Sequence, residues 1–318
     1  MTLTSPALDP TIRVWQSRIA DVSDTHDPDA DERTRSRLLS DRLFAEFGEI
    51  PSPAARTTHR IATESGDLRI DEYRPAGAIG ELPAYLVLHG GAFRLGDLDE
   101  LINVAFCSNR AVEAEYAVFC PDYALAPMRP HPAASLDARA ALSWLREHSA
   151  ELRIDPTRIV VGGVSAGGAL AASLCLWARD NGVPVRGQLL EVPVVDLSDD
   201  APWLPEYGEL NGLPSVADLR AGYVSEQDAE SPAVSPLRGD LRGLPTTHVM
   251  TAEFDPLRAG GEALVERLAA AGNRVTGTRH LGSLHGTQSL LQGYRGARLW
   301  HREVVSVLRD FAERPAQL

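Results

Sequence analysis

The feature that most constrains the fold of this chain is a regular alternation of short strand-like runs with longer helical stretches, which begins at about residue 56. The strand-like runs lie at 68–73, 84–88, 117–120, 158–161, 188–192, 246–252 and 274–280. Stretches with the apolar spacing of helices lie at 132–150, 166–181, 262–271 and 287–311. This order predicts the α/β class, with a mostly parallel central sheet and helices on both faces.

Two segments do not follow the alternation. Residues 1–55 have the apolar spacing of amphipathic helices, and residues 197–232 form an irregular insertion that carries Pro, Trp and Tyr. We interpret the first as an N-terminal cap segment and the second as a cap insertion. The core then consists of residues 56–196 and 233–318, and the helical cap lies over the carboxyl edge of the sheet, where open α/β folds bind ligands.

The composition excludes several functions. The chain has 44 acidic and 31 basic residues, a net charge of −13, which repels nucleic acids and anionic membranes and favours neutral or cationic small molecules. It contains no lysine, so a Ser-Lys dyad or a Schiff base is excluded. Three cysteines without CxxC spacing indicate free thiols, and no apolar run approaches the ~18 residues of a membrane span. We expect a cytoplasmic protein, and its association into a homo-oligomer stays open.

The main chemical signal is Gly163-Val164-Ser165-Ala166-Gly167, which matches G-x-S-x-G between a predicted strand and a predicted helix. Small residues on both sides allow a strained turn that lifts the serine hydroxyl clear of the sheet. The following helix directs its positive end to the same place, which favours developing negative charge. We therefore predict that Ser165 is a nucleophile.

A serine nucleophile needs a base and a carboxylate, and both follow in the chain order Ser, Asp, His. Asp255 follows the strand predicted at 246–252, and His285 follows the strand predicted at 274–280. Each has a rival nearby, Asp196 for the carboxylate and His280 for the base. His280 lies within a predicted strand, where a packing or hydrogen-bonding role is favoured.

A third signal is His89-Gly90-Gly91-Ala92, directly after the apolar run at 84–88. Glycines let the backbone approach a substrate carbonyl, so the amides of Gly90, Gly91 and Ala166 are predicted to form an oxyanion hole. His89 is interpreted as a structural anchor of this loop. Glu191 and Glu253, near the ends of strands, are expected to form salt bridges or hydrogen bonds.

Together these motifs resemble the hormone-sensitive-lipase family of α/β-hydrolases, in particular its bacterial esterases and the heroin-esterase-like acetyl esterases. The resemblance covers residues 72–286 and is carried by His89-Gly90-Gly91, Asp122-Tyr123-Ala124-Leu125-Ala126-Pro127, Ser165-Ala166-Gly167-Gly168, Asp255-Pro256-Leu257-Arg258 and His285-Gly286. It implies hydrolysis of short-chain esters through an acyl-enzyme, without cofactor or metal. The chain departs from the family at Val164, where Asp or Thr is usual, and at Ala92, where a third glycine is usual. For Asp255, the Asp-Pro-Leu context of the family is the reason to prefer it over Asp196.

Three questions stay open at this level. Four aromatic residues either line the substrate pocket or form the core of the cap: Trp15, Trp203, Tyr207 and Tyr223. The same triad also serves lactone or thioester hydrolysis, acyl transfer and cyclisation. A non-catalytic small-ligand receptor on this scaffold is the rival of another class, and the presence of His285 argues against it.

Overall fold

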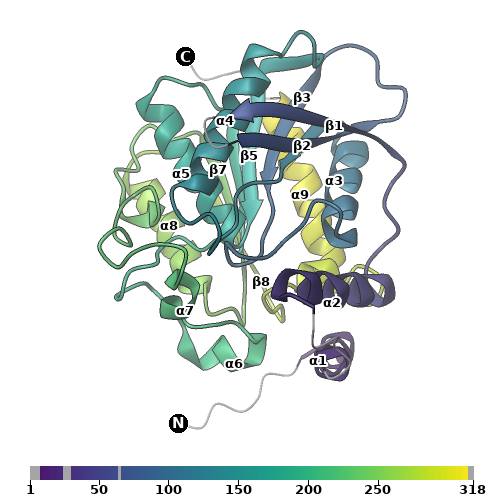
Figure 1. The fold of residues 1–318 in the computed structure, drawn as a ribbon, viewed down its shortest axis with the longest axis vertical. Helices are drawn as coiled ribbons and strands as arrows, with labels where there is room; N and C mark the ends of the chain where they lie inside the picture. Colours follow the sequence, from purple (N-terminus) through teal and green to yellow (C-terminus); the bar gives the residue numbers. More distant parts are fainter. Residues whose placement is uncertain (1–7, 24–29, 64–65, 314–318) are drawn as a thin grey trace.

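The computed structural model describes residues 8–23, 30–63 and 66–313, and its centre is an eight-stranded sheet (Figure 1). The strands are β1 (Ala54–Thr63), β2 (Gly66–Pro75), β3 (Leu82–Leu88), β4 (Ala117–Pro121), β5 (Ile154–Val164), β6 (Gly187–Glu191), β7 (Thr246–Ala252) and β8 (Val275–His280). Their order in the sheet is β1-β2-β4-β3-β5-β6-β7-β8. The pairs from β4 to β8 are parallel, whereas β2 is antiparallel to both β1 and β4. The predicted α/β class and mostly parallel sheet are confirmed.

Helices cover both faces of this sheet. The helices of the core are α3 (Leu101–Ala114), α4 (Ala133–Glu147), α5 (Ala166–Asp180), α8 (Arg258–Ala270) and α9 (Arg295–Glu313). In Figure 1, α3 and α9 lie on one side of the strands and α5 and α8 on the other. Alternate side chains of the central strands therefore enter two separate apolar clusters. Leu86 and Val161 pack on the α4, α5 and α8 face, and Tyr85 and Val160 pack on the α3 and α9 face.

The structure differs from the prediction at several elements. Strand β1 and helix α3 were not predicted as elements, and the boundary placed at residue 55 falls inside β1. The last helix begins at Arg295 and not at residue 287, because a short 3-10 helix, η3 (Thr287–Ser289), and a turn come first. The helix predicted at 262–271 begins four residues earlier, at Arg258.

The two segments predicted as a cap contain α1 (Pro10–Ser23) and α2 (Glu32–Phe47), then η1 (Pro205–Tyr207), α6 (Gly208–Asn211) and α7 (Val216–Arg220). Figure 1 shows α1, α2, α6 and α7 together at one end of the sheet. Gln16 of α1 donates a hydrogen bond to the carbonyl of Leu210 in α6, which joins the two segments directly. Residues 1–7 and 24–29 of the N-terminal segment lie outside the described residues.

No helix within residues 8–23, 30–63 and 66–313 combines the length and the apolar character that crossing a membrane requires.

Candidate active site

Ser165 occupies a strained turn between β5 and α5. Its φ of 55° and ψ of −116° are unusual for a residue with a side chain, and neighbouring hydrogen bonds hold this conformation. The Ser165 amide donates to the carbonyl of Glu191 at 2.9 Å, and the amide of Val194 donates to the Ser165 carbonyl at 3.1 Å. The turn also requires Gly167, because a Cβ there would lie 2.0 Å from the carbonyl oxygen of Leu88.

The structure brings Ser165, His285 and Asp255 into one hydrogen-bonded chain. His285 Nε2 lies 3.1 Å from Ser165 Oγ, and His285 Nδ1 lies 2.8 Å from Asp255 Oδ2. A carboxylate only accepts hydrogen bonds, so Nδ1 carries the proton and the Nε2 lone pair faces the serine. Asp255 is fully buried, and its Oδ1 accepts the Leu257 amide at 2.9 Å. This arrangement can take a proton from the serine hydroxyl.

The two rivals are engaged elsewhere. Asp196 accepts hydrogen bonds from Ser198 and from Arg238. His280 packs on Trp300 at a ring distance of 4.2 Å and lies 3.0 Å from Glu303. Neither side chain belongs to the hydrogen-bonded chain that contains Ser165.

The loop after β3 places the predicted oxyanion residues beside the serine. Gly90 and Gly91 line the same cavity as Ser165, and a Cβ on Gly90 would lie 3.6 Å from the Ser165 Cβ. Gly91 has a φ of 126°, and a Cβ there would lie 2.0 Å from the carbonyl oxygen of Leu95. Ala166 is the first residue of α5, so its amide lies at the positive end of that helix.

His89 holds the start of this loop through its side chain and its carbonyl group. Its ring stacks on Tyr123 at 4.2 Å, its Nδ1 donates to the Gly90 carbonyl at 2.7 Å, and the Tyr123 hydroxyl donates to the His89 carbonyl at 2.7 Å. Burial lowers the pKa of His89 to about 4, so the ring is neutral at neutral pH. These contacts match the structural role predicted for His89.

A buried polar cluster around Glu191 lies next to the turn at Ser165. The sequence predicted a salt bridge or hydrogen bond for Glu191 but did not identify its partners. Glu191 is fully buried, lies 2.8 Å from Arg110 of α3, and accepts a hydrogen bond from Trp300 of α9 at 2.7 Å. Because the carbonyl of Glu191 accepts the Ser165 amide, this cluster helps to fix the position of the Ser165 backbone. Glu253, the second glutamate considered, accepts the Gly282 amide instead.

Asn211, at the end of α6, supports the histidine and the carboxylate together. Its Oδ1 accepts the His285 amide at 2.7 Å, and its Nδ2 donates to the carbonyls of Phe254 and Tyr207 at 2.6 and 2.7 Å. The residue ties the loops after β7 and β8 to the insertion. No sequence signal marked it, since a single asparagine in an irregular segment has no pattern.

A cavity of about 560 Å³ opens above Ser165 and His285. One part of its wall, which we call the α2 side, consists of polar residues from three elements. Glu32, Ser36 and Ser40 come from α2, Glu100 and Asn103 from the start of α3, and Gln288 from η3. Another part, the insertion side, consists of Val194, Leu213, Pro214, Leu219 and Leu257. Ile102 and Phe106 of α3 and the charged Arg94 and Asp218 also line the cavity, so its wall is mixed, and the polar residues of the α2 side form one part of it.

None of the four aromatic residues proposed for the pocket is among the described residues that line this cavity. Tyr223 is buried and stacks on Phe93 at 4.0 Å, and Trp203 packs against the core under the insertion. Tyr207 contacts Phe254 and Arg258. Trp15 contacts Gly286, a residue of the cavity wall, but is not itself part of that wall. These four side chains therefore pack within the protein and do not form the surface of this cavity.

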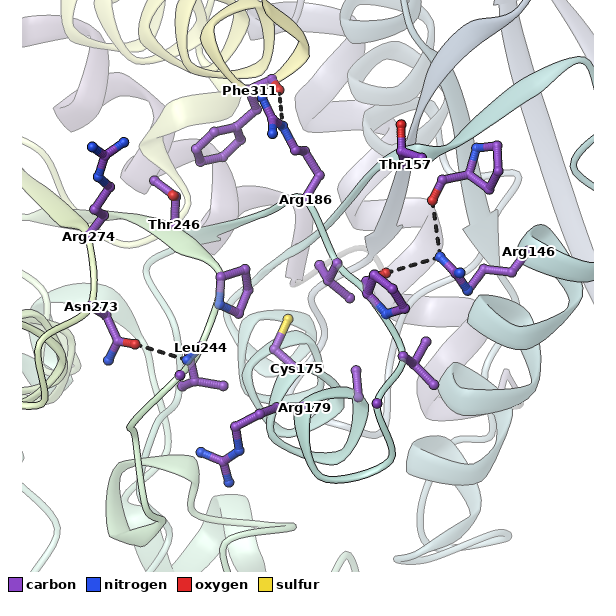
Figure 2. A pocket seen from close by; sticks show the side chains of 18 of the residues that line it. Arg146, Thr157, Cys175, Arg179, Arg186, Leu244, Thr246, Asn273, Arg274 and Phe311 are labelled. Atoms are coloured by element: carbon purple, nitrogen blue, oxygen red, sulfur yellow. Dashed lines mark hydrogen bonds between the residues drawn. The ribbon is translucent and has the colours of Figure 1, made fainter. Parts of the chain in front are cut away.

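A second cavity, of about 750 Å³, lies at the opposite edge of the sheet, where β6 and β7 begin (Figure 2). Two of its arginines bind backbone carbonyls: Arg146 donates to Pro156 and Pro184, and Arg186 donates to Phe311. Cys175 is buried within it, and burial raises the pKa of this thiol. The cavity is remote from Ser165, and ligands of open α/β sheets bind at the other edge.

A serine on a strand-to-helix turn, a histidine and a carboxylate after later strands, and a glycine-rich loop after an earlier one are the arrangement that is typical of hydrolases of the α/β type. Comparisons with known proteins agree. The profile of a family described as alpha/beta hydrolase fold matches residues 85–289. The chain belongs to this family, in the branch related to hormone-sensitive lipase.

Two relatives and one solved structure illustrate the similarity. The chain is 35% identical to the carboxylic ester hydrolase LipN of Mycobacterium tuberculosis, over 96% of this chain and 84% of that protein. It is 34% identical to an ethyl acetate hydrolase of Pseudomonas putida, over 79% of this chain and 80% of that one. An esterase of Pyrobaculum calidifontis superposes with a TM-score of 0.84 at 31% identity, covering 96% of this chain and 99% of its own.

Proposed function

We propose that this chain is a serine carboxylesterase that hydrolyses short-chain esters through an acyl-enzyme on Ser165. The observation that carries the proposal is the continuous contact from Ser165 Oγ through His285 to Asp255, at 3.1 and 2.8 Å. The relatives named for carboxylic esters and ethyl acetate support the same class of substrate.

In the first half of the reaction, Ser165 Oγ attacks the ester carbonyl while His285 Nε2 takes the hydroxyl proton. Asp255 stabilises the imidazolium that forms and holds its tautomer. The amides of Gly90, Gly91 and Ala166 stabilise the oxyanion, and each such donor is typically worth ~10²–10³ in rate. His285 then gives the proton to the leaving alcohol, and a water molecule repeats the steps to release the acid.

We assign the cap to the N-terminal segment and residues 197–232, because α2 and the insertion both contribute to the wall of the cavity. Together they enclose the ester above the nucleophile. The size of the cavity, about 560 Å³, suits a small molecule.

Replacing the nucleophile tests the proposal. In a Ser165→Ala variant we expect turnover of 4-nitrophenyl acetate to fall by at least ~10⁴-fold, because the covalent step is lost. Ser173→Ala, a change on the same helix α5 outside the cavity, is the matched control and should keep its turnover. Full activity in Ser165→Ala would contradict the mechanism.

Two further assays separate the alternatives. A fluorophosphonate should label Ser165, and failure to label it would favour a non-catalytic receptor. A panel of matched ester, lactone and thioester substrates should give its highest kcat/KM with the esters, and a preference for either other class would replace the ester assignment.

A further inference from the structure

Glu100 is a buried carboxylate in the wall of the substrate cavity, and the proposed reaction does not use it. The side chain is 7% exposed and forms part of the α2 side. Although Glu100 is the N-cap of α3, it makes no side-chain hydrogen bond to that helix. Its hydrogen bond from Ser40 Oγ is long, at 3.4 Å. Burying a carboxylate with so little compensation is costly unless another group pairs with it.

The charged groups around Glu100 do not supply that partner. Asp41 and Arg37 face it from α2, and Asp97 faces it from its own loop. Arg37 lies 3.3 Å from Asp97 and 3.8 Å from Asp41, so its charge is shared between those two carboxylates. Within the described residues, no ion pair to Glu100 is formed. Burial, Asp41 and Asp97 together raise the pKa of Glu100 to about 7.

A second acceptor in the wall of the same cavity has no hydrogen-bond donor among the described residues. Gln288 is 7% exposed, and its Oε1 is buried without a hydrogen-bond partner among the described residues. Glu32, also of the α2 side, adds a further carboxylate. Arg94, a cation of the cavity wall, contacts the insertion instead, where it donates to the Asp218 carbonyl at 3.4 Å. The α2 side therefore presents hydrogen-bond acceptors and negative charge to whatever the cavity holds.

We propose that the α2 side is a subsite for a protonated amine, and that the preferred substrates are esters with an ammonium group on the acyl or the alcohol part. This inference rests on the proposed esterase function and adds the substrate class. An ammonium group supplies N–H donors and the positive charge that Glu100 lacks. The net charge of −13 also attracts cations to the cavity and repels anionic esters.

Two pairs of isosteric esters test the proposal. The first is 3-(dimethylamino)propyl butanoate against 4-methylpentyl butanoate, and the second is ethyl 4-(dimethylamino)butanoate against ethyl 5-methylhexanoate. We expect kcat/KM at pH 8 to be at least about tenfold higher for the ammonium ester in one of the pairs, as a charge-assisted contact implies. The pair that shows this preference identifies the part of the ester that occupies the α2 side.

Glu100→Gln should reduce that ratio about tenfold, whereas Glu46→Gln should leave it unchanged. Glu46→Gln is the matched control. It removes one negative charge, as Glu100→Gln does, but from an exposed position on α2 outside the cavity. In the wild type the ratio should rise from pH 6 to pH 8 as Glu100 ionises. The neutral ester of each pair corrects for the effect of pH on the chemical steps that both esters share. This pH series needs no variant, so it decides the question even where Glu100→Gln fails to fold.

Equal kcat/KM within both pairs, or equal losses of the ratio in the Glu100 and Glu46 variants, would overturn the inference. In that case hydrolysis of the neutral esters, and its loss in Ser165→Ala, would leave the esterase function intact. Failure of the enzyme to hydrolyse any ester, together with an unlabelled Ser165, would overturn the proposed function itself.

Discussion

At the scale of single residues, the chemistry of the turn could be read from the sequence, but the chemistry of the cavity could not. Gly163 and Gly167 are required by close approach of the backbone, and the G-x-S-x-G motif expresses that requirement locally. Glu100 belongs to no motif. Its role depends on Ser40 and Gln288, residues that are distant in the chain and meet only in the folded protein.

The same glutamate should make stability depend on pH. The pKa of Glu100 is raised from 4.5 to about 7 in the folded protein, so the unfolded chain releases its proton at lower pH. Stability gained from the protonated form is present below about pH 4.5 and is lost as the pH rises through 7. Glu100→Gln lacks this loss. We therefore expect the variant to gain in unfolding temperature relative to the wild type as the pH rises. The difference between the two proteins should increase by roughly 3 °C from pH 5 to pH 8.

Thermal unfolding in buffers of equal ionic strength measures this difference. Glu46→Gln, which removes an exposed carboxylate, should show no such increase. A difference that is the same at pH 5 and pH 8 would mean that Glu100 ionises normally in the folded protein.

At the scale of elements, strands with continuous apolar runs were predicted well, and the missing elements have physical explanations. Strand β1 lies at the edge of the sheet with mostly exposed side chains, so it has no apolar run. Helix α3 is buried on several sides, which obscures its helical spacing. It also begins without a side-chain cap and ends at Glu115 with a φ of 61°, where glycine would be the usual signal.

Helix α6 shows how the insertion holds the loops that carry His285 and Asp255. We expect Asn211→Ala to lower kcat for 4-nitrophenyl acetate by about tenfold, because the loops of His285 and Asp255 lose a shared anchor. The loss of three part-buried hydrogen bonds should also cost about 1–3 kcal/mol of unfolding free energy. Asn181→Ala, at the exposed end of α5, is the control and should retain kcat. Wild-type kcat in Asn211→Ala would show that the loops hold their geometry without α6.

At the scale of the whole molecule, Glu191 and its partners connect the turn at Ser165 to two helices that are distant in the sequence. Arg110 comes from α3, Glu191 ends β6 and Trp300 lies in α9. The sequence indicated that Glu191 would be paired, but it could not identify partners 81 and 109 residues away. The positions of Ser165, Asp255 and His285 could be predicted because each follows a strand, and parallel strands end at the same edge of the sheet. The partners of Glu191 could not be predicted, because they depend on how α3 and α9 pack against the sheet.

Arg110→Met should be strongly destabilising, because it leaves Glu191 as a buried and unpaired charge. We expect a loss of about 3–5 kcal/mol in the free energy of unfolding. The double variant Arg110→Met/Glu191→Gln removes the charge as well and should recover at least half of that loss. Urea denaturation of the two variants and the wild type measures both values. Additive losses in the double variant would show that the two side chains contribute independently.

The cavity wall has a consequence for how this enzyme diverges from its relatives. The α2 side and the insertion side come mainly from segments outside the strands, while Ser165, His285 and Asp255 follow strands of the sheet. Substitutions in α2 can therefore change the chemistry of the bound ester without disturbing the serine. We therefore expect that exchange of α2 and of the start of α3, which carries Glu100, between homologues would change the class of ester that is preferred and leave Ser165, the proposed nucleophile, in place.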